Sequence, residues 1–260
     1  MLNKVPEVTI FFWVIKVMAT TVGETAADFL NVDLGFGLTN TSVVMAVLLA
    51  VALAVQLTRD RYVPAVYWLT VVLISVVGTL VTDFLTDVMH VPLLTSTSVF
   101  SALLLATFAA WYASERTLSI HTVFTRRREL YYWTAILFTF ALGTAGGDYA
   151  SEGLGWGYAT GTAVFGVLIA AIAIGHGAFR LNAVLAFWLA YILTRPLGAS
   201  LGDLMSQAPS DGGLGWSSSA INGTFLATIV ALVVYLSWTK VDRTENRRLA
   251  VEAPGATACD

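Results

Sequence analysis

One pattern occurs four times along this 260-residue chain: a tryptophan, a glycine ten residues later, and an aspartate five residues after the glycine. The four copies are Trp13-Gly23-Asp28, Trp68-Gly78-Asp83, Trp133-Gly143-Asp148 and Trp188-Gly198-Asp203, with tryptophans 55, 65 and 55 residues apart. Such self-similarity is typical of one structural unit copied in tandem. Each copy places a carboxylate in an otherwise apolar segment, where an ionisable group usually has a function.

The composition indicates a membrane protein. Hydrophobic residues make up 57% of the chain and charged residues only 12%, about half the charged share of a soluble domain. The apolar runs are about 18–22 residues long, the length that crosses a bilayer. The first run is expected to be a retained helix, because it is a copy of the repeat and contains Lys16. The single cysteine, Cys259, excludes an intrachain disulfide.

Eight membrane spans fit the pattern, and each repeat supplies two. They are predicted at about 9–30, 41–57, 66–86, 96–113, 131–150, 161–178, 184–204 and 219–238. Twelve of the 14 lysines and arginines then fall in loops on one side of the membrane. Basic residues collect in cytoplasmic loops, so both termini are predicted to be cytoplasmic.

The predicted fold is an all-α membrane protein with eight transmembrane helices. Repeats of two spans all insert the same way up, so the four units are predicted to be parallel around a pseudo-symmetry axis along the membrane normal. The repeats cover about 9–60, 64–115, 129–180 and 184–240 of a single domain at 1–240, and a polar cytoplasmic tail follows at 241–260.

Depth and packing follow from the same pattern. The tryptophans are expected to anchor at the cytoplasmic interface, and each aspartate lies about 22 Å further along its helix. Small residues stand five and one positions before every aspartate, as at Gly23 and Ala27. Small residues at this spacing let helices approach closely. We therefore expect the odd-numbered helices inside the even-numbered ones, with the aspartates facing inward, although polar packing contacts alone would also explain them.

The candidate site is a set of intramembrane charges. The predicted ion- or proton-binding residues are Asp28, Asp83, Asp148, Asp203, Glu24 and Glu152, and the predicted metal ligands are Glu24, Asp28 and Asp148. Lys16 and Arg195 are the predicted countercharges, either as structural salt bridges or as groups that a cation or proton displaces. Close carboxylates in a low dielectric need protons or a cation as compensation. Oxygen ligands favour a hard cation such as Mg²⁺ or Mn²⁺.

Several segments resemble a known family. They are 4–8 (KVPEV), 21–29 (TVGETAADF), 112–121 (YASERTLSIH) and 194–203 (TRPLGASLGD). On these segments the chain resembles bacterial membrane-anchored proteins built from four tandem two-helix "repeats of unknown function", each with a characteristic tryptophan. The resemblance covers about 4–240 and implies four repeats and eight spans, but no activity.

Transport of a cation is the favoured function. The cation would be a divalent or trivalent metal ion, exchanged for protons, in a protein whose other partner is the lipid bilayer. A non-transporting sensor or partner subunit, and a transporter of small organic solutes bound through Arg195 or Lys16, remain alternatives. No phosphate loop, zinc cluster or nucleophile motif is present, so neither an enzyme nor a nucleic-acid partner is expected. Apart from a bound metal such as Mn²⁺ or Mg²⁺ no cofactor is expected, and the protein could form a homo-oligomer.

Overall fold

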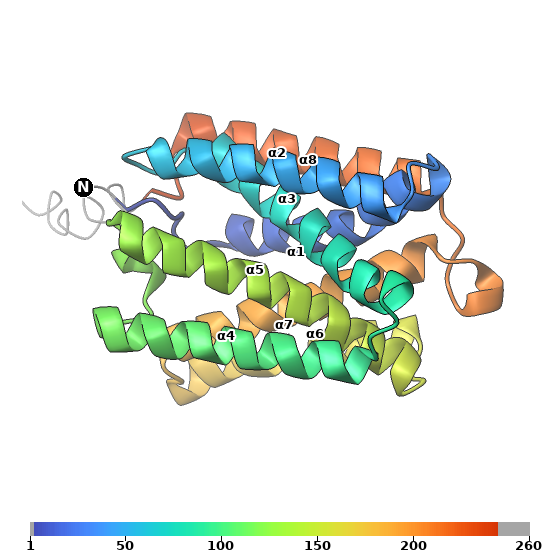
Figure 1. The fold of residues 1–260 in the computed structure, drawn as a ribbon. Coiled ribbons are helices and arrows are strands. Elements are labelled where there is room, and N and C mark those ends of the chain that lie inside the picture. The colour runs from blue at the N-terminus through green and yellow to red at the C-terminus, as the bar shows by residue number, and fades with distance from the viewer. Residues whose placement is uncertain (1–2, 244–260) are drawn as a thin grey trace, which may run out of the picture.

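In a computed structural model that describes residues 3–243, the chain forms eight long helices (Figure 1). They are α1 (Ile10–Asp28), α2 (Leu38–Thr58), α3 (Pro64–Asp83), α4 (Leu93–Glu115), α5 (Arg126–Asp148), α6 (Tyr158–Phe179), α7 (Ala183–Ser206) and α8 (Ser218–Thr239). Two 3₁₀ turns lie at Ile120–Thr122 and Pro209–Asp211. Each predicted span coincides with one helix, so the all-α prediction is confirmed. Most of the predicted tail, residues 244–260, lies outside the described residues.

Local sequence signals mark where the helices begin. The Thr9 hydroxyl accepts a hydrogen bond from the Phe12 amide at the start of α1, and the Thr125 hydroxyl accepts one from the Arg128 amide at the start of α5. These side chains satisfy amides that the first helical turn leaves without a partner. Pro64 occupies the first position of α3, where its missing N–H costs nothing.

Seven of the eight helices are long and apolar enough to cross a membrane. The exception is α5, in which tyrosines and glycines dilute the apolar stretch and the first turn carries Arg126, Arg127, Arg128 and Glu129. The chain is therefore a membrane protein, with length and hydropathy supporting seven of the predicted spans. The lower hydropathy of α5 fits its place inside the bundle, where most of its surface meets other helices.

The odd-numbered helices form an inner ring, in which α1 packs on α3, α3 on α5, α5 on α7, and α7 back on α1. The even-numbered helices lie outside it: α2 packs on α3, α4 on α5, α6 on α7 and α8 on α1. More than half of the apolar stretch of α1, α3 and α7 is buried, against less than a third of that in α2, α4, α6 and α8. The prediction that odd helices lie inside even ones is confirmed.

The repeat glycines allow the ring helices to approach one another closely. A Cβ added at Gly23 would lie 1.8 Å from the Ser75 hydroxyl oxygen on α3, and one at Gly143 would lie 2.4 Å from the Arg195 Cβ on α7. The other two glycines meet the equivalent side chains in the same way: Gly78 meets Phe140 on α5, and Gly198 meets Thr20 on α1. Each repeat glycine thus contacts the next helix of the ring, at the residue eight positions before that helix's aspartate. The contact of Gly198 with α1 closes the ring.

Three of the four repeat tryptophans lie inside the bundle rather than at its surface. Trp68, Trp133 and Trp188 are buried, and only Trp13 is half-buried. The ring of Trp68 packs against Tyr67 at 5.1 Å between centroids, and that of Trp133 packs against Tyr67 at 5.5 Å. The expectation of interfacial anchoring is therefore wrong for these three side chains, because the ring helices are covered by an outer layer. The Trp188 indole, for example, packs on Phe108 and Trp111 of the outer helix α4.

The segment before α1 closes the end of the bundle where the basic loops gather. Lys4 makes a buried ion pair of 2.7 Å with Glu129 in the first turn of α5, and the Glu129 carboxylate also accepts a hydrogen bond from Gln56 on α2. Next to it, Tyr62 donates to Asp242 at 2.6 Å. Burial raises the pKa of the Asp242 carboxyl, and this hydrogen bond opposes the rise. Backbone hydrogen bonds also tie the start of the chain to these segments, because the Tyr62 amide donates to the Asn3 carbonyl and the Glu7 amide donates to the Asp242 carbonyl.

Candidate functional site

The four repeat aspartates lie towards the end of the ring opposite the basic loops. Asp28, Asp83 and Asp148 are the last residues of α1, α3 and α5, whereas Asp203 lies inside α7. Asp203 is buried and the other three are half-buried, so none of the four side chains is fully exposed. The burial of Asp203 fits the predicted inward orientation, whereas the sequence did not indicate that the other three end an α-helical segment.

A π-helical turn follows each of the first three aspartates. These turns span Phe29–Asp33, Phe84–Val88 and Tyr149–Gly153. Each ends in a backbone hydrogen bond over five residues, from Leu34 to Phe29 at 2.9 Å in the first repeat and from Leu154 to Tyr149 at 2.8 Å in the third. π-Helical turns are rare and occur frequently at functional sites. Because these turns recur directly after the aspartate in three repeats, they point to this end of the ring as a candidate functional region.

Below the aspartates, the side chains at steps of four along each ring helix are all buried. The first layer contains Glu24, Thr79, Thr144 and Ala199; the second contains Thr20, Ser75, Phe140 and Arg195; the third contains Lys16, Val71, Ile136 and Tyr191. A period of four keeps neighbouring members of a stripe on nearly the same face. These side chains therefore face the inside of the ring and form three successive layers.

Arg195 joins all four ring helices. Its guanidinium forms an ion pair of 2.9 Å with the Glu24 carboxylate on α1 and donates to the Thr20 carbonyl at 3.0 Å. It also donates to the hydroxyl of Thr79 on α3 and, at 2.7 Å, to that of Thr144 on α5. Arg195 is fully buried, and an unpaired guanidinium there would be costly. Arg195 thus forms a salt bridge, one of the two roles predicted for this countercharge, and its partner is Glu24.

Lys16 is the second buried cation, and it has no acidic partner among the described residues. Its ammonium lies 3.9 Å from the centroid of the Phe140 ring and 4.2 Å from that of the Tyr191 ring. No hydrogen bond to the ammonium is found within the described chain. The expectation that Lys16 forms a salt bridge is therefore wrong, because two aromatic faces take the place of a carboxylate.

Three carboxylates meet above Arg195. Glu24, Asp148 and Asp203 each place one oxygen within 4.8 Å of the other two. Within residues 3–243, Asp148 and Asp203 make neither an ion pair nor a side-chain hydrogen bond, whereas Glu24 is bonded to Arg195. Oxygens at these separations could converge on one hard cation. The predicted metal ligands share Glu24 and Asp148 with this group, but its third member is Asp203 instead of Asp28.

The remaining candidate residues lie around this group. Asp28 and Asp83 are half-buried at the ends of their helices, and Glu152 is exposed in the third π-helical turn. Pro196 lies inside α7, where a proline removes one backbone hydrogen bond and usually kinks or breaks the helix. Helix α7 nevertheless runs without interruption from Ala183 to Ser206, so the backbone is not unwound there.

One buried polar contact was missed from the sequence. Thr25 on α1 donates to the Asn222 side chain at 2.7 Å, and the Asn222 amide donates back to the Thr25 carbonyl at 3.1 Å. This pair fixes α8 beside the carboxylates. The only sequence signal was an asparagine within the last apolar span, which a search restricted to charged residues overlooks.

Comparison with known proteins identifies the repeats. A family model described as "Repeat of Unknown Function (DUF347)" matches the chain four times, at residues 11–62, 66–117, 131–179 and 186–242. Each match covers one ring helix and the outer helix that follows it. No curated protein and no solved structure matches the chain. The four-repeat organisation is thereby confirmed, and the chain belongs to the Repeat of Unknown Function (DUF347) family.

Proposed function

We propose that this protein is an integral membrane transport protein that moves a cation through the carboxylate group of Glu24, Asp148 and Asp203. The observation that carries the proposal is the convergence of three carboxylate oxygens within 4.8 Å of one another, with no basic partner for two of them among the described residues. Ligands of this type favour hard cations over soft ones.

The local charge balance supports a divalent ion. Arg195 neutralises Glu24 through their ion pair, which leaves the charges of Asp148 and Asp203 to be compensated. Two ionised carboxylates in a low-dielectric site repel each other unless a cation or protons intervene. A divalent cation balances both charges, and two protons do the same in its absence. The proposal therefore includes exchange of a metal ion for protons.

We further propose that the four repeats are parallel and related by an axis along the membrane normal, with both termini in the cytoplasm of a bacterial inner membrane. The recurring contact of each repeat glycine with the equivalent position in the next ring helix supports this relation. The absence of lysine and arginine from the loops that follow the odd helices supports the orientation. In this arrangement the carboxylates are reached from the outer side.

A second function, a non-transporting cation sensor, is favoured by how tightly the ring is filled. Phe140 in the layer of Arg195, and Ile136, Tyr191 and Lys16 in the layer below it, are all fully buried. A cation that binds from outside therefore meets two fixed positive charges and a packed aromatic layer before the other end of the bundle. Transport requires these groups to move, whereas sensing does not.

Binding and flux measurements separate these functions. We expect Mg²⁺ or Mn²⁺ to raise the melting temperature of the purified protein, because a ligand that binds only the folded state stabilises it. Asp148→Asn and Asp203→Asn should each weaken binding in isothermal titration, and lower pH should weaken it in the wild type because the ligands must be deprotonated. The matched controls are Asp33→Asn and Asp211→Asn, which change exposed carboxylates near the same end.

The result decides the function as follows. Metal binding together with metal flux into proteoliposomes supports transport, and binding without flux supports the sensor. If the wild type and both site variants bind metal equally, the carboxylates are structural polar contacts and the cation site is refuted.

A further inference from the structure

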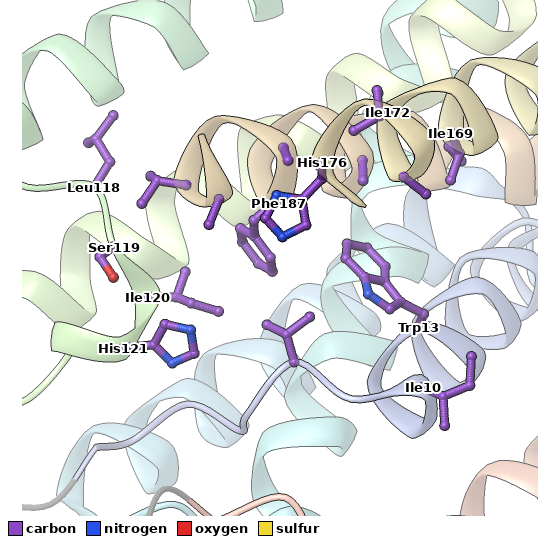
Figure 2. Close-up of a pocket in the computed structure, with 16 residues that line it drawn as sticks. Ile10, Trp13, Leu118, Ser119, Ile120, His121, Ile169, Ile172, His176 and Phe187 are labelled. Atoms are coloured by element: carbon purple, nitrogen blue, oxygen red, sulfur yellow. The ribbon is translucent and has the colours of Figure 1, made fainter. Parts of the chain in front are cut away.

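A cavity of about 680 Å³ lies on the side of the bundle, away from the carboxylates (Figure 2). Its walls come from the start of α1, the last turns of α6, the start of α7 and the loop before α5. The lining is mainly apolar and includes Trp13, Ile169, Ile172 and Phe187. Its volume is in the range of cavities that hold small organic molecules.

The cavity lies beside surfaces that face the lipid. Ile10, which lines it, is 69% exposed. Helix α6 is the least buried of the seven candidate spans, and α6 and α8 do not pack closely on each other. An apolar cavity of this kind is not filled by water but takes up apolar molecules. In a bilayer, the hydrocarbon next to it is a lipid acyl chain.

Polar groups mark only one end of the cavity. Ser119, His121 and His176 line it there, and Figure 2 shows the two imidazoles on different walls. The His176 Nδ1 lies 2.8 Å from the Leu181 carbonyl, and the His121 Nδ1 lies 3.3 Å from a Glu7 carboxylate oxygen. Both contacts use Nδ1, so the Nε2 atom of each ring is the nitrogen left to meet a ligand.

The charge around this end favours an anion. It is the end of the bundle where the loops carry Arg59, Arg61, Arg116, Arg126, Arg127, Arg128 and Arg180. Arg180 directly follows α6, one turn beyond His176. Of the acidic residues at this end, Glu115 is paired with Arg128, Glu129 with Lys4 and Glu7 with His121. Basic residues placed next to a membrane span attract anionic lipid headgroups.

We propose that this cavity binds one anionic phospholipid, with an acyl chain against Trp13 and Phe187 and the phosphate at His121 and His176. The apolar lining accounts for the chain, and the single polar end within a basic surface accounts for the headgroup. The lipid would fill the space between α6 and the start of α1, and so hold the outer layer against the ring. This site is independent of the carboxylates and of any transported ion.

Native mass spectrometry of the full chain in detergent tests the proposal, with phosphatidylglycerol and phosphatidylcholine as the added lipids. We expect the wild type to retain one phosphatidylglycerol at least tenfold more strongly than phosphatidylcholine, judged by the lipid concentration at half occupancy. Ala173→Phe places a ring in the cavity and should abolish this retention. His176→Ala, which removes an exposed side chain, should reduce the preference for the anionic lipid.

Two matched variants control for surface effects. Ala50→Phe adds the same bulk to an exposed position on α2, and His90→Ala removes an exposed histidine at the opposite end. Both should retain phosphatidylglycerol as the wild type does. Equal retention of the two lipids by the wild type would overturn the proposal, and so would unchanged anionic preference in His176→Ala. If Ala173→Phe is not monodisperse, the His176 comparison decides alone.

Discussion

The ion pair between Arg195 and Glu24 makes a quantitative prediction about stability. The two side chains are 0% and 8% exposed, so water cannot replace either partner. Removing one partner of a buried pair costs about 3–5 kcal/mol. We expect Arg195→Gln to fall at the upper end, because the hydrogen bonds to Thr79 and Thr144 are lost as well. Glu24→Gln strands the guanidinium and should cost a similar amount.

The double variant separates the pair from general disruption of the core. Two amides at these positions leave no buried charge, so the double variant should be more stable than the sum of the single changes predicts, by about 2–3 kcal/mol. The measurement is the free energy of unfolding in a titration with sodium dodecyl sulfate, followed by circular dichroism. The partly exposed pair of Arg128 and Glu115 is the control, for which we expect a coupling below about 1 kcal/mol. A coupling within about 0.5 kcal/mol of zero for the buried pair would refute the reasoning.

Three further predictions follow from the packing and the topology. Gly143→Ala should lower the free energy of unfolding by about 1–3 kcal/mol, because its Cβ would lie 2.4 Å from a side-chain carbon of α7. Gly146→Ala, whose Cβ would lie 3.8 Å from its nearest neighbour, should not lower it. Equal losses in the two variants would contradict the close approach. Lys16→Met should leave the melting temperature unchanged or raise it, since the ammonium has no anionic partner to lose and the thioether packs well on aromatic rings. A large drop in melting temperature would contradict this reasoning. Reporters fused after Lys240 and inserted at Asp211 should lie on opposite sides of the membrane, and the same side for both would contradict the topology.

The architecture was largely predictable because its signal repeats. Small residues before every aspartate indicated which helices approach closely, and Gly23 and Gly198 do make such contacts. Steps of four back from the aspartates of the second and third repeats lead to Thr79 and Thr144, which both bind the Arg195 guanidinium. A periodic pattern fixes which face of a helix points inward, and this is enough to place the layers.

Contacts that depend on one particular neighbour were not predictable. Lys16 has the same spacing from its aspartate as Val71 and Tyr191 have from theirs, and nothing in that spacing says that two rings will surround it. The Trp68 indole was placed at the interface because general statistics favour it there. Its burial results from the second layer of helices, which a pattern read one helix at a time does not contain.

The choice of Asp28 as a metal ligand has a similar origin. The first and third repeats share a glycine-rich segment after the aspartate, LGFG at 34–37 and LGWG at 154–157, and this similarity favoured Asp28 as the partner of Asp148. In the ring, however, α5 and α7 are neighbours, as are α7 and α1, whereas α1 and α5 do not pack closely on each other. Asp203 on α7 therefore joins Asp148 and Glu24. The order of helices around the ring decides which carboxylates meet, and repeat similarity alone does not give that order.

Closure of the ring between α7 and α1 has a consequence for biosynthesis. Glu24 and Arg195 are separated by 171 residues, and ribosomes add about 5–20 residues per second. Roughly 10–30 s therefore pass between the synthesis of α1 and the synthesis of its partner helix α7. During that interval it carries Lys16 and Glu24 with neither the Tyr191 ring nor the guanidinium available. A membrane segment with two ionisable side chains is poorly tolerated by lipid alone. The nascent first helix is thus expected to stay beside the insertion machinery until the last repeat arrives.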